Sequence, residues 1–249
     1  MLRMVCIIPA RMGSTRFPGK PLAPICGRPM IEHVYRRCRM NPSLDAVYVA
    51  TCDREIAEAT EAFGGAAIMT SSSHQRASDR VAEAAERMNA DVIIMVQGDE
   101  PMIHPTMIDT AVQPLRDNPS VVCTNLAAPI RSLEEMNDLN TIKIVTARNG
   151  SALYFSRQPI PSGSSEGLKQ VCVIPFRRDF LLQYARLEPT PLEIAESVDM
   201  LRILEHGFPV RIVPTTYVTH AVDTPADLEL VERLLAADSL MPQYLKGTR

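Results

Sequence analysis

The segment 4–22, MVCIIPARMGSTRFPGKPL, joins a short apolar run to a loop that is rich in glycine, hydroxyl and basic residues. The apolar part, 4–10, predicts a buried strand. The loop would leave the carboxyl end of that strand, which is where open α/β sheets bind their ligands. Gly13 and Gly19 allow the loop backbone to approach a ligand closely. The segment therefore predicts an α/β fold with a ligand site at its first loop.

The side chains of this loop suit a polyanion such as a nucleoside triphosphate. Ser14 and Thr15 offer hydroxyl groups, and Arg11, Arg16 and Lys20 bring three cations to one loop. Neither the GxxxxGK[ST] pattern of P-loop proteins nor the GxGxxG pattern of dinucleotide sites occurs in it. A solvated basic turn is the alternative interpretation, but the position after the first strand favours phosphate binding.

Short β-branched runs alternate with amphipathic stretches along the chain, which is typical of βαβ units around a mainly parallel sheet. We expect strands at 4–10, 46–51, 66–70, 91–97, 121–126, 142–147, 152–156, 170–176 and 210–215. We expect helices at 30–39, 54–63, 79–88, 105–116, 191–205 and 225–236. The Gly/Ser-rich segment 161–167 predicts a mobile surface loop. The predicted fold is α/β, with a mixed, mostly parallel central sheet, helices on both faces and a small inserted lobe.

Composition narrows the class of protein further. The chain has 249 residues, of which 46% are hydrophobic, so it can form a substantial core as a single domain. Its net charge of −3 gives no basic stripe for nucleic acid. The apolar run near the N-terminus ends at Pro9 and Arg11, too early for a membrane span or a signal peptide, so we expect a cytoplasmic protein with no membrane partner. The six cysteines form no CxxC pair and are expected to be buried free thiols.

Two aspartates are candidate magnesium ligands. The motif VQGDEP at 96–101 follows the most apolar expected strand, which places Gln97 and Asp99 at the carboxyl edge of the sheet. Magnesium favours one or two carboxylates together with phosphate oxygens, and AVDTP supplies a second carboxylate, Asp223. The alternative for Asp223 is a cap of the helix at 225–236, and Asp53 is interpreted as a helix cap as well.

An ordered series of motifs resembles one family along nearly the whole chain. The series is PARMGSTRFPGKPL, ATCDREI, MTSSSHQRASDR, VQGDEPMI, IKIV, ALYFSRQPIP, ESVDMLR and AVDTP. It resembles the 3-deoxy-manno-octulosonate (Kdo) cytidylyltransferases, also called CMP-Kdo synthetases. The resemblance implies a Rossmann-related, GT-A-like nucleotidyltransferase fold, usually a homodimer, that converts CTP and Kdo to CMP-Kdo and diphosphate for lipopolysaccharide biosynthesis. It also implies a nucleotide-binding half at about 1–120, an acceptor-binding and dimerisation lobe at about 121–209, and a return to the core at about 210–249.

The resemblance implies a role for each matching residue. Asp99 and Asp223 would hold Mg²⁺, and Arg11 and Lys20 would act with them in catalysis. The residues expected to bind CTP are Ala10, Arg11, Gly13, Ser14, Lys20 and Arg80. The residues expected to bind the acidic 2-keto sugar are Gln97, Arg157, Gln170 and Asp199.

Three segments depart from the family pattern. The family has His-x-Gly-[Ile/Leu]-Tyr where this chain has Gln170 to Ile174 with Cys172 at the centre, and Ser-[Leu/Ile]-Glu-Gln-Leu-Arg where it has SVDMLR at 197–202. The family's Ser-Gly-Thr before the acidic residue and Arg80 is replaced by RAS at 76–78. Each unpaired polar group in a binding site commonly costs about 1–3 kcal/mol. We therefore hypothesise that the CTP and magnesium half is intact while the acceptor pocket is retuned toward a related 2-keto acid.

Three alternatives stay open on the sequence. The departures at 170–174 and 197–202 are also consistent with neutral drift in an ordinary CMP-Kdo synthetase. The same fold serves nucleotidyltransferases for other sugar acceptors. The third alternative is a non-catalytic nucleotide-binding relative. The presence of Arg11, Lys20, Asp99 and Asp223 disfavours it, because a protein without catalysis has no need of these residues.

Overall fold

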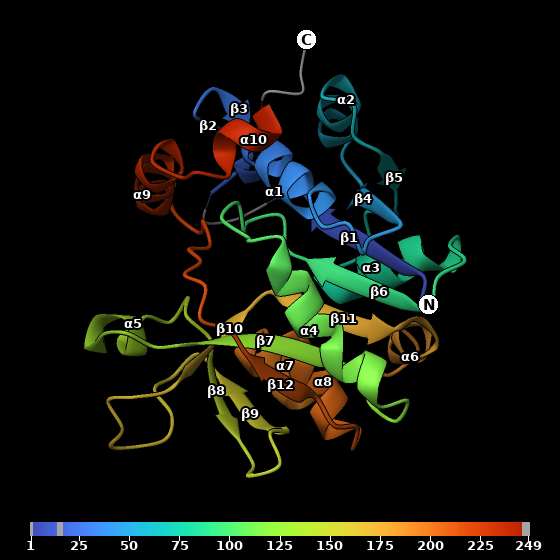
Figure 1. Ribbon diagram of the computed structural model, residues 1–249. Helices are drawn as coiled ribbons and strands as arrows, with labels where there is room; N and C mark the ends of the chain where they lie inside the picture. The colour runs from blue at the N-terminus through green and yellow to red at the C-terminus, as the bar shows by residue number, and fades with distance from the viewer. Residues whose placement is uncertain (1, 14–16, 246–249) are drawn as a thin grey trace.

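The first of two five-stranded sheets carries the start of the chain (Figure 1). The computed structural model describes residues 2–13 and 17–245. The strand order in this sheet is β11-β6-β1-β4-β5. The strands are β1 (Met4–Ala10), β4 (Ala46–Thr51), β5 (Ala67–Met69), β6 (Val92–Val96) and β11 (Val173–Arg177). All neighbours are parallel except β11, which runs antiparallel to β6. The mostly parallel central sheet is confirmed.

Helices cover both faces of this sheet, because β1 is apolar on both sides. Met4, Cys6 and Ile8 belong to the core formed with α1 (Met30–Arg39) and α4 (Thr106–Asp117). Val5 and Ile7 alternate with them and pack with α3 (Ala77–Glu86) on the other face. All seven residues of β1 are buried, as the continuous apolar run predicts. Two further helices flank the sheet, α2 (Arg54–Ala62) after β4 and α6 (Arg178–Tyr184) after β11.

The second sheet forms most of a lobe below the first one in Figure 1 and has the order β12-β7-β10-β8-β9. Its strands are β7 (Thr124–Pro129), β8 (Lys143–Thr146), β9 (Ala152–Ser156), β10 (Leu168–Val171) and β12 (Arg211–Pro214). Neighbours are antiparallel except β12, which is parallel to β7. The helices of this part are α5 (Leu133–Asn137), α7 (Pro191–Glu196) and α8 (Asp199–Glu205). The segment 161–167 contains no helix or strand, which agrees with the predicted loop.

Two predicted elements are each divided in two, and both divisions matter for the site. The expected strand at 170–176 breaks at Cys172, where the chain leaves β10 in the second sheet and enters β11 in the first. The expected helix at 191–205 breaks at Ser197, whose φ of 55° and ψ of 48° are left-handed. Apolar periodicity continues across both breaks, so it gives no signal for either.

The chain returns from the second sheet to the first through an extended segment at 215–224, which we call the strap (Figure 1). It leads from β12 to α9 (Pro225–Ala236), and α10 (Met241–Leu245) follows. A small core of Ile25, Met30, Val231 and Leu235 holds α9 against the start of α1. The remaining short elements, η1 (Lys20–Leu22), β2 (Pro24–Ile25) and β3 (Arg28–Pro29), connect the first loop to α1. The C-terminal end of the strap therefore lies beside the first loop, where Asp223 contacts Lys20.

Candidate active site

The first loop is closed by backbone contacts and anchored by an aspartate. Gly19 donates its N–H to the Met12 carbonyl oxygen at 3.1 Å, and its φ of 74° is the left-handed conformation that glycine tolerates best. The Met12 N–H donates to Asp53 Oδ2 at 2.7 Å. Asp53 stands at the N-cap position of α2 but makes no side-chain cap bond there. Asp53 therefore holds the cap position that the sequence predicts, but its carboxylate orients the first loop and does not cap α2.

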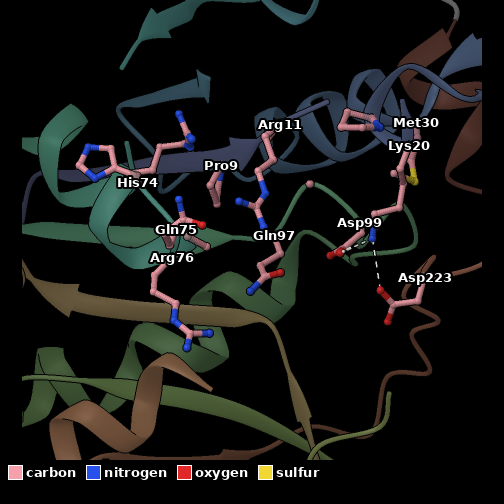
Figure 2. A pocket seen from close by; sticks show the side chains of 15 residues that line it. Pro9, Arg11, Lys20, Met30, His74, Gln75, Arg76, Gln97, Asp99 and Asp223 are labelled. Carbon is pink, nitrogen blue, oxygen red and sulfur yellow. Dashed lines mark hydrogen bonds and ion pairs between the residues drawn. The ribbon is translucent and has the colours of Figure 1, made fainter. Parts of the chain in front are cut away.

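A pocket lies where β1 and β6 end, beside this loop (Figure 2). The residues that line it are Pro9, Ala10, Arg11, Lys20, Pro21, Met30, His74, Gln75, Arg76, Ala77, Arg80, Gln97, Gly98, Asp99 and Asp223. The structure thus brings together Ala10, Arg11, Lys20, Arg80, Gln97, Asp99 and Asp223 of the predicted site. Gly13 is exposed and is not among the lining residues, and Ser14 lies outside the described residues.

Lys20, Asp99 and Asp223 meet at one end of the pocket (Figure 2). The Lys20 ammonium lies 2.8 Å from Asp99 Oδ2 and 3.3 Å from Asp223 Oδ1. Burial alone would lower the pKa of Lys20, but the two carboxylates outweigh it and raise the pKa. Lys20 is therefore fully charged at neutral pH.

The strap positions Asp223. The Val222 N–H donates to the Asp99 carbonyl oxygen at 2.9 Å, so the two aspartates are joined through the backbone as well as through Lys20. Thr224, and not Asp223, caps α9, because its hydroxyl accepts from the Asp227 N–H. The alternative interpretation of Asp223 as a helix cap is therefore wrong.

The carboxylate pair has the chemistry of a magnesium site. Asp99 and Asp223 already converge on one cation, the Lys20 ammonium. The described residues contain no group of three or more His, Cys, Asp and Glu side chains able to hold a metal. Two carboxylates completed by phosphate oxygens are the usual arrangement for Mg²⁺, so the residues present fit that ion.

The other cations of the pocket are held differently. Arg80 is 3% exposed and donates to Thr70 Oγ1 at 2.5 Å and to the Ser71 carbonyl oxygen at 3.3 Å. Its guanidinium is fixed by uncharged partners and keeps its charge available to a ligand. Arg11 extends into the pocket toward Gln97 in Figure 2.

Gly98 permits the close approach of the two strand ends, a role that the sequence analysis missed. A Cβ atom on Gly98 would lie 3.0 Å from the Pro9 carbonyl oxygen and 3.1 Å from Ile31 Cδ1. A side chain at this position would therefore push against the backbone of Pro9 and the side chain of Ile31. A glycine between two polar residues at the end of an apolar strand was the available signal.

Glu100 is a second residue that the sequence analysis missed. It is 3% exposed, and its Oε2 atom has no hydrogen-bond partner among the described residues. Burial, followed by the charge of Asp99, raises its pKa to about 8. Its Oε1 atom accepts from the Cys172 N–H at 3.5 Å, and the Gln97 N–H donates to the Cys172 carbonyl oxygen at 3.1 Å. Cys172, between β10 and β11, therefore links the Gln97–Glu100 segment of the site to the second sheet.

The predicted sugar-binding residues other than Gln97 lie in the second part of the chain and are not among the residues that line the pocket. Gln170 Nε2 donates to Asn125 Oδ1 at 2.6 Å. Arg157 donates to the carbonyl oxygens of Leu139, Glu196 and Ser197. Asp199 Oδ2 accepts from the N–H and hydroxyl of Ser78 at 3.1 and 2.7 Å, and burial raises the Asp199 pKa against those bonds.

The cysteines show a mixed pattern. All six are free thiols; Cys6, Cys38 and Cys123 are buried, as expected, whereas Cys26, Cys52 and Cys172 are partly exposed. Burial raises the pKa of the Cys172 thiol, and the carboxylates of Glu100 and Asp99 raise it further. Cys172 is therefore held in the thiol form, which is a poor nucleophile.

A mostly parallel sheet with paired carboxylates and several cations at its carboxyl edge defines the class of α/β nucleotidyltransferases. Residues 5–212 match the model of the family described as Cytidylyltransferase. The chain belongs to this family, and over nearly its whole length it matches the 3-deoxy-manno-octulosonate cytidylyltransferases. The predicted family is confirmed.

Three comparisons show how similar the relatives are. The chain is 47% identical to the 3-deoxy-manno-octulosonate cytidylyltransferase of Geobacter metallireducens, covering 94% of this chain and 98% of the relative. It is 43% identical to the protein of the same name from Solibacter usitatus, covering 96% of each. A solved structure of CMP:2-keto-3-deoxy-manno-octonic acid synthetase in complex with CTP superposes with a TM-score of 0.87 at 41% identity, covering 94% of this chain and 99% of that one.

Proposed function

We propose that the chain is a cytidylyltransferase that transfers CMP from CTP to the anomeric hydroxyl of a 2-keto-3-deoxy sugar acid and releases diphosphate. Kdo is the first candidate acceptor, since relatives at 43–47% identity carry the name of the Kdo enzyme. The single observation that carries the proposal is the convergence of Lys20, Asp99 and Asp223 at one end of a pocket that Arg11 and Arg80 also line.

The reaction is an in-line displacement at phosphorus. The anomeric oxygen bonds to the α-phosphorus of CTP, the bond from that phosphorus to the β-phosphate oxygen breaks, and the hydroxyl proton passes to solvent. Mg²⁺, when bound to Asp99 and Asp223, would neutralise phosphate charge and lower the pKa of the attacking hydroxyl. Lys20 and Arg11 would stabilise the charge that develops on the departing diphosphate. Most of the catalysis would come from positioning and charge neutralisation.

The acceptor stays open to a related 2-keto acid, because the altered positions are occupied within the protein. Gln170 is bound to Asn125, Asp199 is bound to Ser78, and Ile174 is 1% exposed in the core. Gln170 Nε2 and Asp199 Oδ2 thus bond within the protein, and Ile174 has no polar group. A retuned acceptor pocket therefore remains a specific hypothesis within the proposed activity.

The test is diphosphate release from CTP with Mg²⁺ across a panel of 2-keto sugar acids that includes Kdo and its deoxy and amino analogues. We expect release that depends on the acceptor, on Mg²⁺ and on Asp99, with the Asp99→Asn variant as the comparison. Ordinary turnover of Kdo with no analogue preferred would contradict the retuning hypothesis. Binding of CTP without turnover of any acceptor would contradict the cytidylyltransferase.

We further propose a homodimer that works in the cytoplasm and supplies an activated sugar acid for lipopolysaccharide or capsule assembly. Sedimentation equilibrium should give twice the 27.6 kDa mass of one chain, and a monomer would contradict the dimer. In the part of the chain that the structure describes, no helix is long and apolar enough to cross a membrane.

A further inference from the structure

Arg76 lines the nucleotide pocket but directs its guanidinium to the acceptor side of the molecule (Figure 2). It precedes the first turn of α3 as the N-cap residue. Its Nη1 donates to Ser197 Oγ at 2.7 Å, its Nη2 donates to the Glu193 carbonyl oxygen at 3.1 Å, and its Nε lies 3.4 Å from Glu193 Oε1. The Arg76 guanidinium is therefore engaged with the end of α7 and the turn between α7 and α8.

That turn needs outside support. Ser197 ends α7 in the left-handed conformation, which residues with a side chain rarely adopt. Val198 follows, and Asp199 starts α8. The bonds from Arg76 to Ser197 and to the Glu193 carbonyl oxygen hold the end of α7 and the turn residue that leads into α8. The position of Asp199 therefore depends on contacts made from α3.

Asp199 itself is bound to the same turn of α3. The Ser78 N–H and hydroxyl both donate to Asp199 Oδ2, and Arg76 Nε lies 4.0 Å from Asp199 Oδ1. Arg80, one helical turn after Arg76, lines the nucleotide pocket. The first turn of α3 thus touches the nucleotide side and the acceptor side at once.

We propose that Arg76 is a positioning residue for the acid-sugar acceptor: it fixes the α7–α8 turn, and with it Asp199, relative to the bound nucleotide. The inference rests on the proposed function, because it takes Asp199 as an acceptor-binding group. Arg76 acts through protein contacts and supplies no reacting atom, so its removal should affect the acceptor more than CTP.

The experiment compares Arg76→Ala and Arg76→Lys with a matched control, Arg178→Ala. Arg178 makes the equivalent clamp at the far end of α3, donating to the carbonyl oxygens of Ala85 and Glu86 at 3.1 and 3.3 Å, away from the pocket. We expect Arg76→Ala to raise the acceptor KM on the order of tenfold, while the KM for CTP and kcat change less than about twofold. Arg76→Lys should recover part of the loss, and Arg178→Ala should leave both KM values unchanged.

Two further measurements separate positioning from direct contact with the sugar. In an Asp199→Asn background, Arg76→Ala should add less than about twofold to the acceptor KM. The reason is that Arg76 is proposed to act on the acceptor through Asp199, so the two changes remove the same interaction. Hydrogen exchange of the amides at 193–200 should be faster in Arg76→Ala than in the parent protein. Multiplicative effects of the two variants, equal changes in both KM values or unchanged exchange would overturn the role of Arg76. A parent protein that turns over no 2-keto acid would instead overturn the proposed function, and with it the role of Asp199.

Discussion

At the scale of single residues, the site is a balance of buried charges. Lys20 carries one positive charge between two carboxylates, and its side chain is only 11% exposed. Removing a charged partner from such a pair leaves the others without compensation. Two consequences of this balance are open to measurement.

Loss of the Lys20 charge should damage the chemical step. For Lys20→Met, which keeps most of the side-chain length, we expect kcat/KM to fall on the order of 10²- to 10³-fold. Lys20→Arg keeps the charge and should be damaged less. Steady-state kinetics with CTP and the best acceptor measures both, and equal losses in the two variants would show that shape rather than charge matters at this position.

Glu100 should make stability fall as the pH rises. Its pKa is about 8 in the folded protein against an ordinary value of 4.5, so the folded state holds an extra proton between these pH values. The cost of ionising Glu100 is absent below pH 4.5 and complete above pH 8. Relative to Glu100→Gln, the parent protein should lose on the order of 2–4 kcal/mol of unfolding free energy between pH 5 and pH 9.

Urea unfolding without Mg²⁺ measures this difference, since a bound cation would favour ionised Glu100. Parallel pH profiles for the parent and Glu100→Gln would contradict the raised pKa.

At the scale of elements, the strap brings Asp223 to Asp99 and Lys20 from a distant part of the chain. It has no regular structure and depends on a few anchors. Tyr217 stacks on His104 with ring centroids 4.2 Å apart, and the Thr106 hydroxyl donates to the Tyr217 hydroxyl at 2.9 Å. These contacts fix the strap on the loop that follows Asp99, so they restrict where Asp223 can lie.

Loss of the contacts that hold the strap should mainly lower the apparent affinity for Mg²⁺. For Tyr217→Ala we expect the Mg²⁺ concentration at half-maximal rate to rise about three- to tenfold, because Asp223 loses preorganisation. Tyr217→Phe keeps the stack and loses only the hydroxyl bond, so it should lie close to the parent. Rates measured across a Mg²⁺ titration test this prediction. An unchanged midpoint in Tyr217→Ala would contradict a role of the strap in positioning Asp223 for Mg²⁺.

At the scale of the whole molecule, a buried ion network joins the two parts of the chain. Arg202 on α8 donates to both oxygens of Glu193, at 2.7 Å each, and to Asp79 on α3 at 2.8 and 3.3 Å. Glu193 is fully buried, and these carboxylates raise the pKa of Arg202 against the opposing effect of its own burial. The network therefore holds α7 and α8 against α3 on the first sheet.

Removing Arg202 should destabilise the protein strongly. Arg202→Met leaves Glu193 without its principal counter-ion, and we expect a loss of about 3–5 kcal/mol in unfolding free energy. Arg233→Met, on the exposed face of α9, is the control and should change stability by less than about 0.5 kcal/mol. Thermal and urea unfolding of both variants test the difference, and similar losses in the two would contradict a structural role of the network.

The sequence by itself determined several elements and part of the candidate site. Strands β1, β4 and β9 and helices α1 and α9 begin and end where their patterns predict, because apolar periodicity and helix-start signals are local. Arg11, Lys20 and Asp99 follow strands, so the rule that ligands bind at carboxyl edges locates them as well. The series of motifs identified the family correctly.

Only the tertiary structure decided how distant segments meet. The contact of Asp53 with the first loop and the contact of Arg76 with the turn at Ser197 join residues 41 and 121 positions apart. The break at Cys172 accompanies a change of sheet. Local patterns report which face of an element is apolar, but not which element covers it. Lys20, Asp99 and Asp223 form one site only through tertiary contacts, because they are far apart in the sequence.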